Sequence, residues 1–142
     1  MSPQSFCTFF DSNYAAQGLS LYSSLKKYAA NNFSLYILCL DDELFNRLKN
    51  MDLTNVTLIS LEKIESAYPE LLEAKSNRSL IEYYFTLSPV LPLYILEQFN
   101  ESIIASLDAD NFFGGRRIPF EMFVLVLSAA DSVRAFGHVR EH

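Results

Sequence analysis

The sequence predicts an α/β fold in which a mostly parallel β-sheet is flanked by helices. The first half of the chain holds three units that each join a short apolar run to a segment with helical periodicity. A fourth apolar run, residues 103–107, ends abruptly in acidic residues. Continuous apolar runs are typical of strands buried on both faces, and three strand-helix units in succession indicate a right-handed parallel sheet.

The first unit is a strand over Ser5–Phe10 followed by a helix. The strand is rich in aromatic and β-favouring residues and stops at Asp11-Ser12-Asn13, residue types that form turns and cap helices. From Tyr14 onward, apolar or small residues recur at helical spacing as far as the Asn31-Asn32 pair.

The second and third units repeat this order. Residues 33–40 predict a second buried strand, and the acids at 41–43 suit the positive end of the helix that follows. Residues 56–59 predict a third strand, with Ser60 as the cap of a helix that continues to Tyr68.

Two further helices are expected before the fourth strand. Residues 69–77 are interpreted as a surface segment, after which Ser79-Leu-Ile-Glu82 has the spacing of a capping box and opens an aromatic-rich helix. Ser88-Pro89 is expected to restart a helix, because proline is tolerated in a first turn, and Pro92 is still near that N-terminus.

Composition excludes several classes of protein. A chain of 142 residues that is 50% hydrophobic can form one globular domain, and a net charge of −6 is against a nucleic-acid or anionic-membrane surface. No window approaches the roughly 20 apolar residues of a membrane span, and the N-terminus lacks the basic region of a secretory signal. Cys7 and Cys39 lie in apolar runs and are expected to be buried thiols, so a cytoplasmic location is expected.

Acidic residues follow two of the predicted strands. Asp108 and Asp110 stand one residue apart, so both side chains point the same way from a strand, and Asp11 ends the first strand. Ligands in open α/β sheets bind outside the carboxyl ends of the strands, so these acids are expected to line one crevice. Paired carboxylates suit a hard cation that holds a diphosphate. A simple turn at Asp108 and Asp110 is the alternative, because aspartate is a common turn former.

The order of these motifs resembles glycogenin-type, family 8 glycosyltransferases of the GT-A fold, and is similar to bacterial nucleotide-diphospho-sugar transferases. The resemblance covers about residues 5–113 and implies a Rossmann-like sheet, the N-terminal nucleotide-sugar-binding half of that fold. The motifs that carry it are Thr8-Phe-Phe-Asp11-Ser-Asn-Tyr14, Ser23-Ser24-Leu25, Leu35-Tyr-Ile-Leu-Cys-Leu-Asp-Asp-Glu43, Ala74-Lys-Ser-Asn-Arg78-Ser, Glu82-Tyr-Tyr-Phe85 and Leu107-Asp108-Ala109-Asp110, the last similar to the DxD motif.

The resemblance also implies a ligand and its site. The ligand would be a nucleotide-diphospho-sugar, expected to be a UDP-sugar, bound through Mn²⁺ or Mg²⁺ with Asp108 and Asp110 as metal ligands. Arg78 is the nearest candidate for the phosphates and Lys75 the second, although a solvated charge beside a helix explains Arg78 equally well. The remaining residues implied at the nucleotide-sugar are Thr8, Phe10, Asp11, Tyr14 and Ala109.

The resemblance stops after Phe113, before the family's acceptor half, so little or no transfer activity is expected. Up to Asp110 there are 14 acidic and 7 basic residues, but the last 32 residues hold 3 and 4, with both histidines. This shift suggests an altered reading frame or premature termination, with residues 114–142 as a divergent tail that is non-native or poorly ordered and His138 as a tail residue. The alternative is that residues 120–130 form a strand or helix covering a sheet edge.

Three other interpretations remain open. A non-catalytic nucleotide-binding or interaction module would bind ligand without turnover. A haloacid-dehalogenase-like phosphohydrolase also uses Asp-x-Asp after a strand, but there the motif opens the fold, and a Thr or Val usually stands where this chain has Phe112. A purely structural role for the Asp108–Asp110 pair predicts no dependence on metal.

Overall fold

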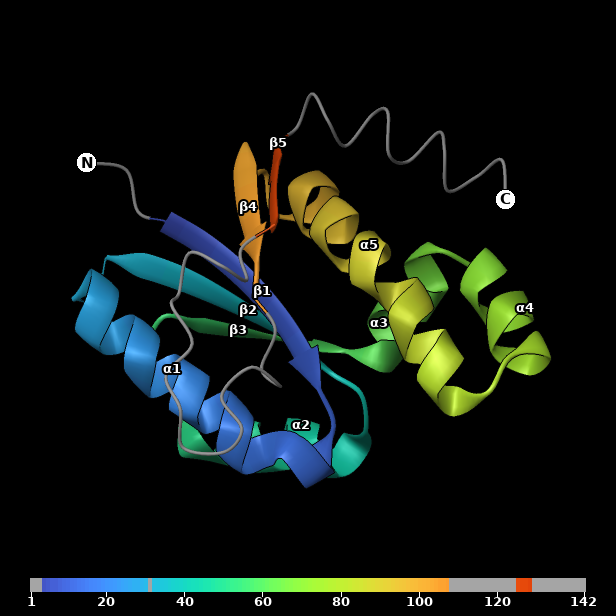
Figure 1. Ribbon diagram of the computed structural model, residues 1–142, viewed down its shortest axis with the longest axis horizontal. Coiled ribbons are helices and arrows are strands. Elements are labelled where there is room, and N and C mark those ends of the chain that lie inside the picture. The colour runs from blue at the N-terminus through green and yellow to red at the C-terminus, as the bar shows by residue number, and fades with distance from the viewer. Residues whose placement is uncertain (1–3, 31, 108–124, 129–142) are drawn as a thin grey trace.

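The computed structural model describes residues 4–30, 32–107 and 125–128, which form a five-stranded sheet in the order β3-β2-β1-β4-β5 (Figure 1). The first four strands run parallel to their neighbours, and the last pairs antiparallel with β4. The predicted α/β class with a mostly parallel sheet is therefore confirmed. The strands are β1 (Gln4–Phe10), β2 (Phe33–Cys39), β3 (Val56–Ser60), β4 (Ile103–Ser106) and β5 (Leu125–Ser128).

Strand β5 lies within residues 120–130, for which the sequence analysis left open a strand or helix that covers a sheet edge. It pairs with all four residues of β4, from Ile103↔Ser128 to Ser106↔Leu125. The rest of the predicted tail lies outside the described residues.

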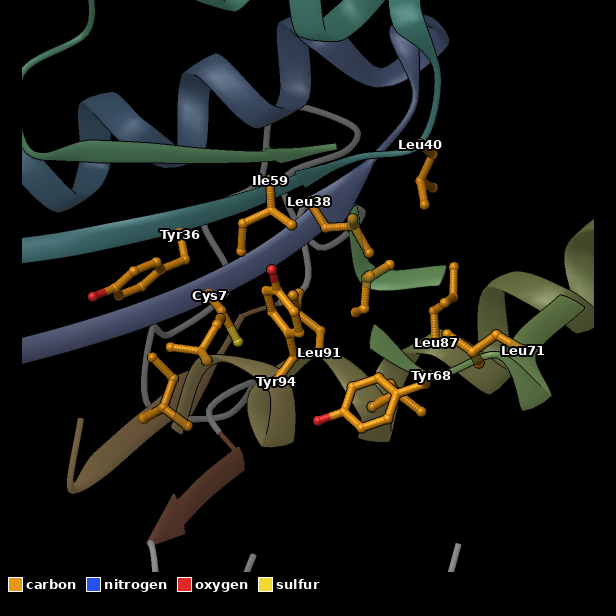
Figure 2. Packing of buried hydrophobic residues seen from close by; sticks show 14 of the residues in the cluster. Cys7, Tyr36, Leu38, Leu40, Ile59, Tyr68, Leu71, Leu87, Leu91 and Tyr94 are labelled. Atoms are coloured by element: carbon orange, nitrogen blue, oxygen red, sulfur yellow. The ribbon is translucent and has the colours of Figure 1, made fainter. Parts of the chain in front are cut away.

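Helices cover both faces of the sheet (Figure 1). Helices α1 (Ala15–Ala29) and α2 (Asp42–Met51) lie on one face, and α3 (Leu61–Ala67), α4 (Glu70–Asn77) and α5 (Leu80–Gln98) lie on the other. Because successive strand residues point to opposite faces, Leu35 and Ile37 pack with α1 and α2, while Tyr36 and Leu38 pack with the other three helices. Figure 2 shows this second cluster, in which Tyr94 and Leu91 of α5 lie beneath the strands.

Residues 69–77 lie mostly on the surface, as predicted, but Glu70–Asn77 also forms a helix, α4, that the sequence analysis did not predict. Glu70 and Glu73 occupy its first turn, where negative charge is favourable, and Leu71 is buried against the core with only 4% of its surface exposed. Leu71 thus attaches an otherwise largely exposed helix to the core.

The predicted restart at Ser88-Pro89 was wrong, because α5 runs unbroken from Leu80 to Gln98 with Pro89 and Pro92 in its interior. An interior proline removes a backbone hydrogen bond and costs about 3 kcal/mol. Burial offsets that cost, since Leu87, Leu91 and Ile95 are each completely buried on the same helix.

The connections place a topological switch beside β1. The chain passes from β1 to β2 and β3 on one side and then returns to β4 on the other side of β1. Phe6 accordingly pairs with Leu35 on one side and with Ala105 on the other. In open α/β sheets the crevice outside the strand ends at such a switch is where ligands bind.

Two expectations about composition can be compared with the structure. Both cysteines are buried and unpaired, as predicted, and burial raises the pKa of each thiol to about 12. Within the described part of the chain, no helix combines the length and the apolar character that crossing a bilayer requires.

Candidate functional site

A cleft of about 580 Å³ opens at the carboxyl ends of β1 and β4, at the topological switch. Three parts of the chain form its walls: the end of β1 with the turn after it, the first half of α5, and the ends of β2 and β4. The lining residues are Phe9, Phe10, Asp11, Asn13 and Tyr14 from the first part, Leu80, Ile81, Tyr84, Phe85 and Ser88 from the second, and Leu40, Ser106 and Leu107 from the third.

The wall made by α5 is a single helical face. Its lining positions, 80, 81, 84, 85 and 88, are spaced so that they share one side of a helix, while Tyr83 and Leu87 point into the core. The predicted capping box sets where this wall begins: Glu82 N donates to Ser79 Oγ at 3.2 Å, and Ser79 N donates to Glu82 Oε1 at 3.1 Å. The cap therefore starts the helix at the rim of the cleft.

Asp11 caps a short 3₁₀ turn, η1 (Ser12–Tyr14), that follows β1. Asp11 Oδ1 accepts a 3.0 Å hydrogen bond from Asn13 N, and Asp11 O accepts one of 3.1 Å from Tyr14 N. These bonds fix the carboxylate at the end of β1 and leave the Tyr14 side chain 39% exposed at the cleft.

A second carboxylate, that of Asp41 after β2, binds this turn through Ser12. Its Oδ2 accepts from Ser12 N and Ser12 Oγ, both at 2.9 Å, and its Oδ1 accepts from Leu44 N at 2.8 Å. Burial alone would raise the pKa of Asp41, but these hydrogen bonds together outweigh burial and lower the pKa below its ordinary value. The carboxylate is therefore ionised at neutral pH.

The described walls of the cleft carry negative charge. Among the described lining residues, Asp11 is the one charged side chain. Burial, and then the charges of Asp11 and Asp41, raise the pKa of the Tyr84 hydroxyl above its ordinary value. A diphosphate entering these walls would meet repulsion unless a cation accompanied it.

The donors present fit a hard cation. Asp11, Asn13, Ser88 and Ser106 bring oxygen ligands to the described walls, the type that Mg²⁺ and Mn²⁺ prefer. Within the described ranges, no three potential ligands among His, Cys, Asp and Glu lie together. The described residues by themselves therefore form no complete set of metal ligands.

The predicted site residues have different positions. Phe10, Asp11 and Tyr14 line the cleft, and their contact with a nucleotide stays a prediction. Thr8 is 1% exposed in β1, is not a lining residue, and its Oγ1 has no hydrogen-bond partner among the described residues. The predictions for Asp108, Ala109 and Asp110 lie outside the described residues, although Asp108 follows the lining residue Leu107 directly in the sequence.

Neither predicted phosphate-binding residue belongs to the described lining. Arg78 Nη1 donates to Thr86 Oγ1 on α5, so the guanidinium lies along another face of that helix. Lys75 Nζ forms an ion pair with Glu65 Oε2 at 3.2 Å. Both side chains thus link α4 to a neighbouring helix, Arg78 to α5 and Lys75 to α3.

Sequence reasoning did not identify the α5 wall or Asp41. The aromatic run at 83–85 was visible, but nothing local showed that Tyr84 and Phe85 face the cleft whereas Tyr83 faces the core. A usable signal was the spacing of 80, 81, 84 and 85 after the capping box. Asp41 was identified only as an acid near a helix start.

No protein-family model matches the chain. A curated relative, the uncharacterized protein YfnD of Bacillus subtilis (strain 168), is 32% identical over 114 residues, which are 80% of this chain and 36% of YfnD. The chain thus spans little more than a third of that relative's length.

Two apo structures are similar in part. The bifunctional glycosyltransferase WbbM matches with a TM-score of 0.44 and 22% identity, covering 77% of this chain and 19% of WbbM. The glycosyltransferase GlyE of Streptococcus pneumoniae TIGR4 matches with 0.48 and 14%, covering 98% of this chain and 37% of GlyE. Because both TM-scores are below 0.5, the description of the fold depends on the strand order above.

Proposed function

We propose that this chain binds a nucleotide-diphospho-sugar of the UDP-sugar class through Mn²⁺ or Mg²⁺, as the donor-binding part of a glycosyltransferase. The observation that carries the proposal is the cleft at the switch between β1 and β4, which joins Asp11 to an aromatic wall. The partial likeness of the sequence motifs to glycosyltransferases agrees with it.

The walls suit the two ends of such a ligand. Tyr14 of η1 and Tyr84 of α5 both contribute aromatic rings to the cleft lining, and rings of this kind stack on a base. The Asp11 carboxylate is an acceptor for a ribose or base donor. Asp108 and Asp110 follow the lining residue Leu107 in the chain and complete the proposed metal ligands.

A bound cation would offset the repulsion between the Asp11 carboxylate and a diphosphate. When bound, Mn²⁺ or Mg²⁺ supplies stabilisation of the negative charge that builds on a diphosphate leaving group. The chain's own contribution is to orient the ligand: Asp11 is held by Asn13 N, and the side chains of the α5 wall would pack against one side of the ligand.

A thermal-shift experiment tests the proposal. UDP with Mn²⁺ at millimolar concentration is expected to raise the melting temperature of the parent chain, because a ligand that binds only the folded state stabilises it. Asp110→Asn should lose this shift. The matched control is Asp52→Asn, the same change at an exposed carboxylate at the end of α2, which should keep it. No shift for the parent, or an equal shift in Asp110→Asn, contradicts the proposal.

A non-catalytic interaction module is the second candidate, and one observation favours it. Leu80, Ile81 and Phe85 at the rim of the cleft are 59%, 67% and 73% exposed, more apolar surface than a nucleotide needs. Donor hydrolysis separates the two candidates: release of UDP from a UDP-sugar supports an enzyme, and binding without release supports the module.

A further inference from the structure

We infer that Asp41 is a positioning residue for the cleft: it holds the Ser12–Tyr14 turn so that Asp11 and Tyr14 face the ligand. Asp41 is not a lining residue, and its role would be exerted through Ser12. The inference rests on the proposed function for the identity of the ligand. That Asp41 holds the Ser12–Tyr14 turn can be tested without any ligand.

The parallel pairing of β1 and β2 brings the two residues together. The last aligned pair is Phe10↔Cys39, and Leu40 N continues the ladder with a 3.1 Å hydrogen bond to Phe10 O. Ser12 and Asp41 each stand two residues beyond that pair. The segments after β1 and β2 leave the sheet at the same level, so the short side chain of Asp41 reaches the backbone of Ser12.

The contacts of Asp41 divide between two elements. Oδ1 accepts from Leu44 N and caps α2, whereas Oδ2 accepts from both the backbone N and the Oγ of Ser12. Two donors from one residue fix its backbone as well as its side chain. The carboxylate therefore ties the cleft turn to the start of a helix that is anchored in the core by Leu44 and Leu48.

Ser60 provides the comparison within the same fold. It also follows a parallel strand, β3, and also caps a helix, since Ser60 Oγ accepts from Lys63 N at 3.2 Å. Among the described residues, its side chain makes no hydrogen bond to the turn after a neighbouring strand, and it is not a lining residue. Ser60 thus caps a helix, as Asp41 does, but lacks contacts like those of Asp41 with Ser12.

The turn held by Asp41 carries the ligand-facing groups. Asp11, Asn13 and Tyr14 line the cleft, and Ser12 between them is the residue that Asp41 holds. Without the two bonds at Ser12, the η1 turn keeps only its internal bonds, from Asn13 N to Asp11 Oδ1 and from Tyr14 N to Asp11 O. A turn with local bonds alone samples more orientations, and ligand affinity falls.

Two measurements on the full chain test this role: the affinity for UDP with Mn²⁺, and amide hydrogen exchange at residues 12 and 13. In Asp41→Asn, we expect affinity to fall about tenfold and exchange at Ser12 N to accelerate, because the single amide oxygen cannot accept from both Ser12 and Leu44 N, and a neutral oxygen is a weaker acceptor than a carboxylate. Ser12→Ala removes one bond and keeps the α2 cap, so it should change both quantities in the same direction but less. Ser60→Ala is the control and should lower the melting temperature while leaving both unchanged.

Each outcome decides the matter. Asp41→Asn with parent-like affinity, or with slow exchange at residues 12 and 13, overturns the inference, and so does an equal loss of affinity in Ser60→Ala. If Asp41→Asn does not fold, Ser12→Ala decides by the same two measurements. A parent chain that does not bind UDP contradicts the proposed function instead, and the exchange measurement then determines alone whether Asp41 holds the turn.

Discussion

The ring of Phe10 lies directly against Gly18 of helix α1. A Cβ atom on residue 18 would come within 2.1 Å of Phe10 Cζ and within 2.5 Å of both Cε atoms. Phe10 is 3% exposed and also contributes to the cleft wall, so the absence of a side chain at residue 18 lets α1 approach the end of β1.

Gly18→Ala is therefore expected to destabilise the chain despite alanine's better helix propensity. Overpacking of this kind typically costs about 1–3 kcal/mol, more than the roughly 1 kcal/mol that alanine gains over glycine within a helix. Urea unfolding measures the change. Ser20→Ala, at an exposed position of the same helix, is the control and should change stability little. Equal or higher stability for Gly18→Ala would contradict the packing described here.

The Tyr36 hydroxyl predicts a loss of stability in alkali. It donates a 2.9 Å hydrogen bond to Glu101 Oε2, and burial together with that bond raises the pKa of Tyr36 to about 12, against an ordinary value of 10.0. A raised pKa means that the folded state keeps the proton longer than the unfolded state. The contribution is therefore complete below pH 10 and is lost as the pH rises toward about 12.

Tyr36→Phe isolates this contribution. The difference in unfolding free energy between the parent chain and Tyr36→Phe should shrink from about pH 9 to about pH 12. A parent advantage over Tyr36→Phe that is constant across this range would refute the assignment.

Phe85 separates ligand binding from stability. Its side chain is 73% exposed on the cleft face of α5, so Phe85→Ser should change the unfolding free energy by no more than about 0.5 kcal/mol. If the α5 wall contacts the nucleotide, the same variant should bind UDP with Mn²⁺ several-fold more weakly. Isothermal titration measures the affinity. Tyr28→Ser, at an exposed aromatic of α1, should leave it unchanged.

Ala30 offers a stabilising substitution. It ends α1 in the left-handed conformation, with φ 46° and ψ 53°, a region that costs a non-glycine residue roughly 1 kcal/mol. Ala30→Gly should raise the unfolding free energy by up to about that amount. Ala29→Gly, one residue earlier inside the helix, should lower it by about 1 kcal/mol. Thermal unfolding of both variants gives the comparison, and a fall in both would rule out relief of strain at Ala30.

The elements themselves were largely predictable because their signals are local. The strands at residues 5–10 and 33–40 agree with β1 and β2 to within one residue, and the Ser79 capping box and the Ser60 cap both form as expected. Of the predicted ligand-facing residues, Phe10, Asp11 and Tyr14 line the cleft because a strand end fixes their position. The metal-binding role of Asp108 and Asp110 stays a prediction.

The sequence by itself determined the class of fold, since apolar runs and helical periodicity are properties of neighbouring residues. Only the tertiary structure decided that β4 lies beside β1, that α5 continues through Pro89 and Pro92, and that Asp41 meets Ser12. These are contacts between residues distant in sequence, or between a helix and the core that covers it. The free energy that stabilises these contacts comes from strand pairing and from burial between distant segments. The residues of the cleft could therefore be identified only once the strand register was known.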